Sequence, residues 1–352
     1  MPQIDPAFHW FRLAFAALLI GSSFRDVCAD QFPIVKPTLK LHNAKAVDQD
    51  DMCLWTHPTV PAQSLVIASD KAGNGIFVYN LKGETLQTLP VSKPGNIDIR
   101  QGVVFGGQSV DIVAVNLRKD RKIAVFKVNS TNRTLERLDK GDIATGSNYG
   151  GTLYRSPKTR KLYFLCTSAD RDIEQFELSD DGQGHVTGRR VRNWAIDKCE
   201  GAVGDDEHGK IYITEEDRGV WELGGEPDDP APGKLIIKLG DHGIAKDLEG
   251  ITIYPTANGD GYLLISSQGP NLFYAFDRKS PHNFVGAFRI EGAQITDGID
   301  VVAASWGTQF PHGLFACHTD IPGRPVLLTP WEKIAKSLAP QLKIRGTELP
   351  AK

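Results

Sequence analysis

Short apolar runs alternate with charged turns along most of this chain. In residues 209–223 an apolar stretch, residues 211–213, enters a charged turn at Glu215–Glu216–Asp217–Arg218, and a second apolar stretch over residues 220–223 leaves it. This order predicts two antiparallel strands joined by a polar turn. Five further segments have the same plan, namely residues 65–81, 111–128, 162–178, 262–277 and 314–331.

Six similar hairpins at a spacing of roughly 45–55 residues are typical of a repeat architecture. We therefore predict an all-β protein, a six-bladed β-propeller with one of these hairpins in each blade. Equivalent turns of a propeller lie at the same end, so the six polar turns are expected to surround one mouth of the central channel. Residues 30–41, extended and broken by Pro, are expected to supply the outer strand that closes the ring with the last blade. Residues 331–338 (WEKIAKSL) are the one stretch with a helical pattern.

The composition agrees with a turn-rich β protein and excludes one class of partner. Of 352 residues, 41% are hydrophobic and 24% are charged, and the chain has 35 Gly and 21 Pro, as expected for a soluble globular protein. The net charge of -3 provides no overall basic field for a nucleic-acid partner. We expect a monomer.

The first 29 residues differ from the rest. Residues 11–21 are apolar but too few for a comfortable transmembrane span, and Val27, Cys28 and Ala29 place small residues at a cleavage position. We expect a signal peptide over residues 1–29, the propeller over residues 30–340 and a loose tail over residues 341–352. This predicts a secreted or periplasmic protein without a membrane partner. A retained anchor and a lipoprotein attached through Cys28 remain alternatives.

Four cysteines remain after such a cleavage, and they favour a structural role. The chain has no CxxC pair, so a thiolate metal site is not expected. Buried thiols are the favoured interpretation, and one disulfide is the alternative in an exported protein. The four are Cys53, Cys166, Cys199 and Cys317.

Acidic residues recur at the starts of strands and in the turns. If they converge on one mouth, they cannot all stay ionised alone, so either their pKa values rise or cations lie among them. Carboxylate and amide oxygens are hard ligands, which favours Ca²⁺ over Zn²⁺. One such residue alone would more often be a solvated turn residue, so the hypothesis depends on the whole set. The set is Asp50, Asp51, Glu200, Glu215, Glu216, Asp247, Glu249, Asp297 and Asp300.

Basic residues occur in the same turns. Metal ions beside Arg and Lys side chains suit a polyphosphorylated ligand, because guanidinium groups bind phosphate in a forked geometry. No GxSxG, P-loop or dinucleotide-binding motif is present in the sequence, so a nucleophilic Ser or a nucleotide site has no support. The basic residues are Lys71, Arg118, Arg171 and Arg218, with Arg100 and Lys246 nearby.

These motifs resemble those of the β-propeller phytases, a bacterial family of calcium-dependent phosphatases that act on inositol hexakisphosphate. The resemblance covers about residues 46–335, and the six-bladed fold predicted from the repeats agrees with the family fold. Its carriers are DQDDMCLWTHP (48–58), SDKAGNGIFVYNLKG (69–83), GNIDIR (95–100), YGGTLYRSPKTRKLYF (149–164), IEQFEL (173–178), EGAVGDDEHGKIYITEEDRGVWEL (200–223), DLEGITIY (247–254), GDGYLLISSQG (259–269), TDGIDV (296–301) and PHGLF (311–315).

The resemblance implies a secreted, calcium-dependent, 3-phytase-like phosphatase that hydrolyses phytate, as its calcium complex, to lower inositol phosphates. In the family several calcium ions bridge carboxylates and phosphates, and a calcium-bound water attacks phosphorus without a covalent enzyme intermediate. Alternation along a strand points only one of Glu215 and Glu216 inward. The implied metal ligands are Asp50, Asp51, Glu200, Glu215 or Glu216, Asp247, Glu249, Gln268 and Asp297. The implied catalytic residues are Tyr149, Glu200, Glu216 and Glu249, and the implied phosphate contacts are Lys71, Arg100, Arg118 and Arg171.

The chain departs from the family mainly at its cations. A lysine pair becomes Lys71-Ala72, and a basic residue of the third turn becomes Ala169, for which Arg171 is the candidate substitute. The calcium ligands are kept while the phosphate-binding cations are fewer, which predicts weaker activity or a less phosphorylated substrate. Two alternatives stay open: a propeller that binds calcium or a ligand without catalysis, and a lactonase-like hydrolase with a mononuclear metal site.

Overall fold

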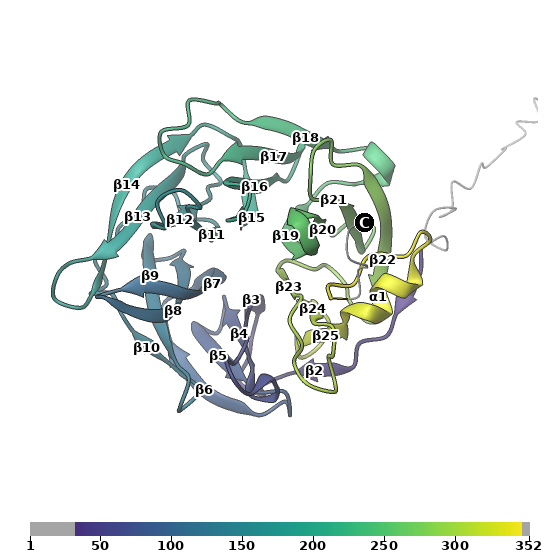
Figure 1. The fold of residues 1–352 in the computed structure, drawn as a ribbon, viewed down its shortest axis with the longest axis horizontal. Coiled ribbons are helices and arrows are strands. Elements are labelled where there is room, and N and C mark those ends of the chain that lie inside the picture. The colour runs from purple at the N-terminus through teal and green to yellow at the C-terminus, as the bar shows by residue number, and fades with distance from the viewer. Residues whose placement is uncertain (1–31, 347–352) are drawn as a thin grey trace, which may run out of the picture. The chain divides into compact units, whose positions relative to one another are not determined.

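The computed structural model describes residues 32–346, and the expected signal peptide over residues 1–29 lies outside them. Residues 32–346 form six β-sheets arranged around a central axis (Figure 1). The strands nearest the axis contact one another in a closed ring, from β3 through β7, β11, β15, β19 and β23 back to β3. The predicted six-bladed β-propeller is confirmed.

Each blade has four antiparallel strands, numbered outward from the channel. The first blade consists of β3 (Gln49–Trp55), β4 (Leu65–Asp70), β5 (Gly75–Tyr79) and β6 (Thr85–Pro90). The second consists of β7 (Pro94–Phe105), β8 (Gln108–Leu117), β9 (Lys122–Asn129) and β10 (Thr134–Arg137). The third consists of β11 (Gly151–Arg155), β12 (Leu162–Cys166), β13 (Ile173–Asp180) and β14 (Val186–Trp194).

The remaining blades follow the same order. The fourth consists of β15 (Cys199–Asp205), β16 (Lys210–Glu215), β17 (Gly219–Gly224) and β18 (Lys234–Lys238). The fifth consists of β19 (Leu248–Pro255), β20 (Gly261–Ser267), β21 (Leu272–Asp277) and β22 (Phe284–Ile290). The sixth contains β23 (Ile299–Val302), β24 (Leu314–Cys317) and β25 (Val326–Pro330). Short 3-10 turns occur at η2 (Pro61–Gln63), η3 (Asp241–Gly243) and η4 (Ala257–Gly259).

The N-terminal segment closes the ring. β2 (Leu39–Leu41) pairs antiparallel with β25 and supplies the fourth strand of the sixth blade. β1 (Ile34–Val35) pairs in parallel with β22 and adds a fifth strand to the fifth blade. The outer closing strand predicted from residues 30–41 is therefore present, and it ties the first residues of the propeller to its last blade.

The six predicted hairpins are the second and third strands of the blades. Every residue of β4 is buried, whereas the outer strand β6 is largely half-buried. The inner strands pack between two neighbouring blades, so both of their faces are apolar and the sequence reads as a continuous run rather than a strict alternation. Within residues 32–346 the buried apolar side chains form one cluster at each boundary between blades.

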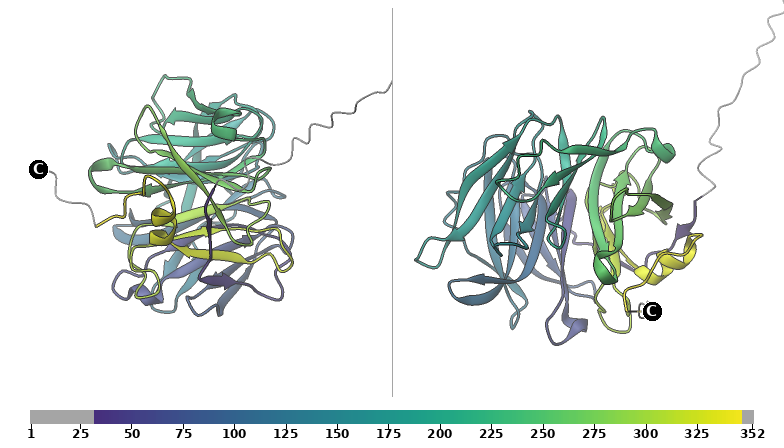
Figure 2. Two further views of the ribbon diagram at one scale, coloured as in Figure 1. Left: turned by 90° about the vertical axis from the view of Figure 1, so that its right-hand side faces the viewer. Right: turned by 45° about the horizontal axis from the view of Figure 1, so that its top comes forward.

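The C-terminal residues pack on the outer edge of the ring (Figure 2). The predicted helix is α1 (Trp331–Ser337), and its Trp331 ring stacks on Tyr254 with centroids 3.9 Å apart. Leu342 is buried and Trp331 Nε1 donates to the carbonyl of Lys343 over 3.1 Å. The part of the expected tail that the structure describes, residues 341–346, thus contacts the propeller. No helix among residues 32–346 has the length and apolar character needed to cross a bilayer.

All four cysteines of the propeller are buried and free, as the favoured interpretation predicted. They are Cys53, Cys166, Cys199 and Cys317.

Strand register brings the turns and the inner strands to one mouth. Cys199, the first residue of β15, pairs with Glu215, the last residue of β16, and Gln49 of β3 pairs with Asp70 of β4. The start of each inner strand therefore lies beside the turn between the second and third strands. Polar side chains from the starts of the inner strands and from these turns therefore lie at the same end of the channel.

Candidate active site and metal centre

A cavity of about 700 Å³ opens at this mouth. Its wall combines carboxylates, most of them from the later blades, with cations from the first two blades. Such a mixed surface suits an anionic ligand that is held by both cations and metal ions. The polar residues that line it are Asp48, Lys71, Asn74, Lys93, Arg118, Lys119, Tyr149, Glu200, Glu249, Gln268 and Asp297.

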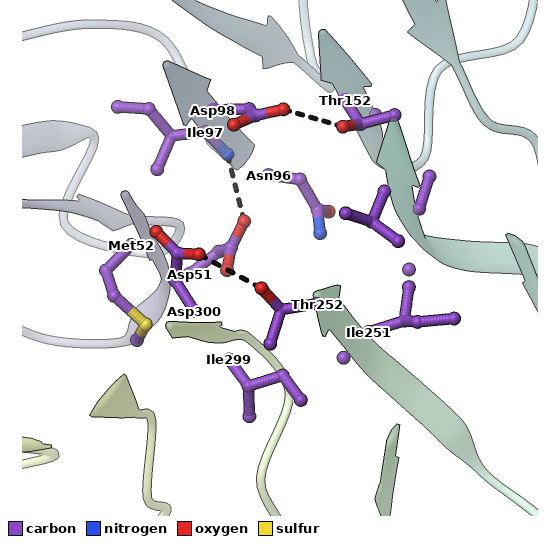
Figure 3. Close-up of a pocket in the computed structure, with 15 residues that line it drawn as sticks. Asp51, Met52, Asn96, Ile97, Asp98, Thr152, Ile251, Thr252, Ile299 and Asp300 are labelled. Atoms are coloured by element: carbon purple, nitrogen blue, oxygen red, sulfur yellow. Dashed lines mark hydrogen bonds between the residues drawn. The ribbon is translucent and has the colours of Figure 1, made fainter. Parts of the chain in front are cut away.

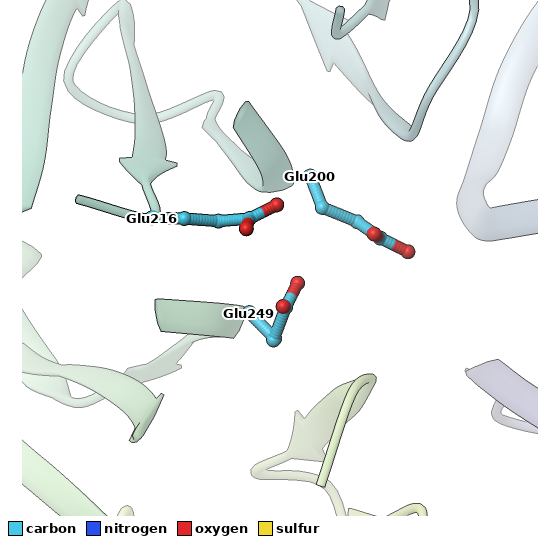
Figure 4. A group of neighbouring side chains, drawn as sticks. All are labelled: Glu200, Glu216 and Glu249. Atoms are coloured by element: carbon cyan, nitrogen blue, oxygen red, sulfur yellow. The ribbon is translucent and has the colours of Figure 1, made fainter. Parts of the chain in front are cut away.

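Three glutamates converge at the boundary between the fourth and fifth blades (Figure 4). Glu200 is the second residue of β15, Glu249 is the second residue of β19, and Glu216 directly follows β16. Each offers a carboxylate oxygen, and these oxygens all lie within 4.8 Å of one another. All three residues are buried. Glu200, Glu216 and Glu249, three of the predicted ligands, thus form one group.

A glycine follows four of the site residues, each at or near the start of an inner strand, and lets the next blade approach. A Cβ on Gly201 would lie 1.6 Å from the carbonyl oxygen of Glu249, and one on Gly150 would lie 2.3 Å from the carbonyl oxygen of Glu200. Real Cβ atoms do not come this close, so the main chains pass each other only because these positions are glycine. The pairs are Tyr149-Gly150, Glu200-Gly201, Glu249-Gly250 and Asp297-Gly298.

Hydroxyl groups hold the inner strands together across the blade boundaries. Thr167 Oγ1 donates to the carbonyl of Glu200 over 3.0 Å, and Ser266 Oγ donates to the carbonyl of Thr296 over 2.8 Å. Thr167 directly follows β12 and Ser266 lies near the end of β20, and they reach Glu200 on β15 and Thr296 just before β23. These bonds fix the main chain from which the site side chains project.

The electrostatics of the three glutamates favour a bound cation. Burial, with the charges of Glu200 and Glu216, raises the pKa of Glu249 to about 10. Burial and the charge of Asp50 raise the pKa of Glu200 to about 7, although Arg118 opposes the shift. Oε1 of Glu216 and Oε2 of Glu249 are buried without a hydrogen-bond partner. An oxygen-only set of carboxylates with unpartnered buried oxygens fits a hard divalent cation such as Ca²⁺.

A second acidic group surrounds Lys71. Its Nζ lies 2.5 Å from Asp50 Oδ1 and 3.6 Å from Asp297 Oδ2, and Gln268 Nε2 donates to Asp297 Oδ1 over 2.5 Å. Burial and the charge of Asp50 raise the pKa of Asp297 to about 8, against the effect of Lys71. Burial alone would raise the pKa of Asp50, but the charge and hydrogen bond of Lys71 outweigh it and the pKa is lowered.

Tyr149 lies between the cation Arg118 and the three glutamates. The Arg118 guanidinium carbon is 4.1 Å from the centre of the Tyr149 ring, and Arg118 Nη1 is 3.3 Å from Glu200 Oε1. Burial and the charges of Glu200, Glu216 and Glu249 raise the pKa of Tyr149. The phenol therefore keeps its proton at neutral pH and can donate a hydrogen bond to an anion.

Asp51 faces the channel below the mouth. Its Oδ2 accepts a hydrogen bond from the main-chain N–H of Ile97 over 3.0 Å, and burial raises its pKa well above the usual range (Figure 3). It lines a cavity of about 40 Å³ together with Asp98 and Asp300. Asp50 and Asp51 are neighbours on β3, so strand alternation sends them to different places.

Besides Asp51, four predicted site residues do not join the group at the mouth. Arg100 pairs with Asp98 and Asp206 at 2.9 and 2.8 Å and lines a separate cavity of about 440 Å³. Arg100 lies in the middle of β7, further along the channel from the mouth than the start of that strand. The exposed Arg171 pairs with Asp197 at 3.4 Å.

The other two lie beside the glutamate group without entering it. Glu215 Oε2 accepts a hydrogen bond from Trp221 Nε1 over 2.6 Å, because alternation turns it away from Glu216. Asp247 is exposed, with a φ of 61°, and its N–H donates to the carbonyl of Glu216 over 3.2 Å.

Sequence reasoning missed several cations at this mouth. Lys93 and Lys119 line the cavity, and Lys198 Nζ lies 2.5 Å from Glu216 Oε2. Lys198 stands two residues before Glu200, and residues two apart in an extended chain project to the same side. That spacing was the available signal.

Comparisons with known proteins agree with this geometry. A family model described as Phytase matches residues 24–347. A 3-phytase from Bacillus subtilis (strain 168) is 34% identical over 310 residues, which cover 82% of this chain and 81% of that protein. A solved structure of a luciferin-regenerating enzyme superposes with a TM-score of 0.52 at 12% identity, covering 83% of this chain and 95% of that chain. That last likeness concerns the fold alone.

Proposed function

The chain belongs to the phytase family and is a phytase-like hydrolase; from this we propose that it is a calcium-dependent phosphatase that hydrolyses phytate, myo-inositol hexakisphosphate, to lower inositol phosphates and phosphate. The observation that carries the calcium dependence is the group formed by Glu200, Glu216 and Glu249. Three buried carboxylates, two of them with an unpartnered oxygen, are costly without a cation.

The glutamate group would hold calcium, with Asp50, Asp297 and Gln268 as the second group of oxygen ligands beside it. Bound there, calcium would neutralise phosphate charge and supply Lewis-acid activation of water. The side chains of the mouth position the substrate relative to the calcium site, and none of them forms a covalent bond to the substrate.

The cations and the tyrosine bind and orient the phosphate to be cleaved. Arg118 and Lys71 border the cavity from the first two blades, next to Glu200 and Asp50 respectively. Their charges oppose the repulsion between phosphate and carboxylates. Tyr149, kept protonated, donates a hydrogen bond to a phosphate oxygen.

Secretion belongs to the same proposal. Residues 1–29 have the apolar run and small residues of a signal peptide. A substrate that reaches the protein as a calcium complex would suit a mouth with both carboxylates and cations.

Phosphate release from inositol hexakisphosphate tests the proposal. The mature chain is assayed with calcium, with magnesium in its place, and with a chelator. Release that requires calcium is the expected result. A folded protein that binds calcium and releases no phosphate would contradict the proposal and favour a propeller that binds calcium or a ligand without catalysis. The exposed Ala72 and Ala169, which carry no charge in turns that otherwise bear cations, would contribute to such an outcome.

A further inference from the structure

The four cations that line the cavity come from one side of the mouth. Lys71 lies in the turn after β4, Lys93 precedes β7, and Arg118 and Lys119 lie in the turn after β8. All four belong to the first two blades or the link between them. A ligand with phosphates around a ring could form a further charge-assisted hydrogen bond if a cation also lay on the other side of the mouth.

The turn of the third blade does not supply the missing cation. Ala169 is exposed in that turn and carries no charge. Arg171 lies in the same turn, but its side chain is 63% exposed and pairs with Asp197 at 3.4 Å. It does not line the cavity.

Lys198 approaches the mouth from this side. Its Nζ is 2.5 Å from Glu216 Oε2 and 5.4 Å from the centre of the Tyr149 ring. Arg118 lies over the same ring at 4.1 Å. Lys198 does not itself line the cavity, but its ammonium group lies beside Glu216 and near the ring of Tyr149, and Tyr149 lines the cavity.

We propose that Lys198 binds a phosphate group of the substrate on the side of the mouth formed by the third and fourth blades. The inference rests on the proposed function, since it names a contact for the same substrate. An ammonium group has three N–H donors, and the bond to Glu216 uses one of them. The side chain is 47% exposed, so the other donors can reach a ligand. Glu216 keeps Oε1 free for a cation while Oε2 holds Lys198 in place.

Binding of a non-hydrolysable analogue tests this directly. The full mature protein is titrated with inositol hexakissulfate at saturating calcium, and calcium binding is measured separately. Lys198→Gln should weaken hexakissulfate binding roughly tenfold, the value of one charge-assisted hydrogen bond. Lys198→Arg should retain most of it. Lys161→Gln is the matched control, because Lys161 forms an exposed pair with Glu177 at 2.8 Å outside the mouth.

The substrate itself supplies a second readout. Lys198→Gln should raise KM for inositol hexakisphosphate by a similar factor with kcat little changed. It should leave KM for a simple phosphate monoester unchanged, because a monoester has no second phosphate for Lys198 to bind. A role as counter-ion of Glu216 alone would instead change calcium affinity and affect both substrates alike.

The outcomes separate the two proposals. Unchanged hexakissulfate affinity in Lys198→Gln overturns the role of Lys198, and so does a loss confined to Arg171→Gln. If the wild-type protein binds hexakissulfate but releases no phosphate from the hexakisphosphate, the catalytic proposal fails and the binding titration still decides the role of Lys198. A wild-type protein that neither binds nor hydrolyses overturns both.

Discussion

The hydroxyl of Thr214, near the end of β16 in the fourth blade, donates a hydrogen bond to the main-chain carbonyl of Glu249 in the fifth blade, over 3.0 Å. The donor sits on β16 one residue before Glu215, and the acceptor belongs to the glutamate with the most strongly raised pKa among those given a value. The bond links two adjacent sheets at the point where the candidate metal site is built. The position of the Glu249 carboxylate therefore depends on a residue that does not face the cavity.

Replacing Thr214 by Val should disturb the site while keeping the shape of the side chain. Loss of one buried hydrogen bond costs about 1–3 kcal/mol of stability, and a misplaced carboxylate should lower calcium-dependent phosphate release by roughly tenfold or more. Thr214→Ser should restore both. Thr187→Val, an exposed position on β14, is the control. Wild-type turnover in Thr214→Val would mean that the bond does not position Glu249.

Gly201→Ala tests the close passage of the inner strands. The added Cβ would lie 1.6 Å from the carbonyl of Glu249, so the fourth and fifth blades must move apart. We expect a lower melting temperature together with loss of calcium-induced stabilisation. Gly75→Ala is the matched control, since the nearest atom to its Cβ would be 3.5 Å away. Equal effects of the two substitutions would show that the passage at Gly201 has no special role.

The neighbouring Glu215 and Glu216 should differ sharply in function. Glu216 joins Glu200 and Glu249, whereas Glu215 accepts a hydrogen bond from Trp221. Glu216→Gln should lower calcium affinity by a factor of roughly ten to one hundred, as removal of one charged ligand contact does. Glu215→Gln should leave calcium affinity near the wild-type value. Calorimetric titration of calcium into the two variants decides the assignment, and a reversed order would place the ligand at Glu215.

The sequence predicted the architecture because the repeats encode it locally. The hairpin at residues 209–223 and its five counterparts contain both strands and the turn within a short window, and all six occur in the structure. The closing strand β2 was also predictable, because a propeller needs one end of the chain to complete its last blade. Burial of inner strands on both faces explains their continuous apolar runs.

The site was predictable where a residue's place at the start of an inner strand or in a turn already directs its side chain to the mouth. Glu200, Glu216 and Glu249 were named from motifs, and the structure brings them together. Arg100 and Arg171 were named in the same way, yet their side chains pair with Asp206 and Asp197. Whether a long cation reaches the mouth depends on carboxylates contributed by other blades or other loops, and those contacts are not local in the sequence.

A glycine that directly follows a polar residue is a sequence signal that could have reduced the number of candidate site residues. A glycine follows each of Tyr149, Glu200, Glu249 and Asp297. It does not follow Glu215 or Arg171. The repeated pair marks four inner-strand starts where the main chain passes close to the neighbouring blade. Asp50 on the inner strand β3 is followed by Asp51 instead, so the pair finds most of these residues and not all of them. Glu216 lacks the glycine because it enters from a turn rather than from an inner strand.

Glu249→Gln should change how the stability of the metal-free protein depends on pH. The pKa of Glu249 rises from a usual value of 4.5 to about 10 on folding, mainly through burial. The folded state therefore holds a proton that the unfolded state has lost, and stability falls as pH rises between these values, by at most about 1.4 kcal/mol per pH unit. Gln stays neutral, so the variant should be more stable than wild type at pH 8 in chelator and should lose this slope.

Calcium should reverse the order of stability between the wild-type protein and Glu249→Gln at pH 8, which makes the test specific. Bound calcium stabilises the ionised carboxylate, so the wild-type protein should gain melting temperature on calcium addition at pH 8, whereas Glu249→Gln should gain little. Melting curves at pH 6 and pH 8, with calcium and with chelator, give the four values needed. Glu215→Gln should keep both the pH slope and the calcium response. An unchanged slope in chelated Glu249→Gln would mean that this carboxylate is not the group that holds the proton, and the charge balance of the glutamate group would have to be assigned to Glu200 instead.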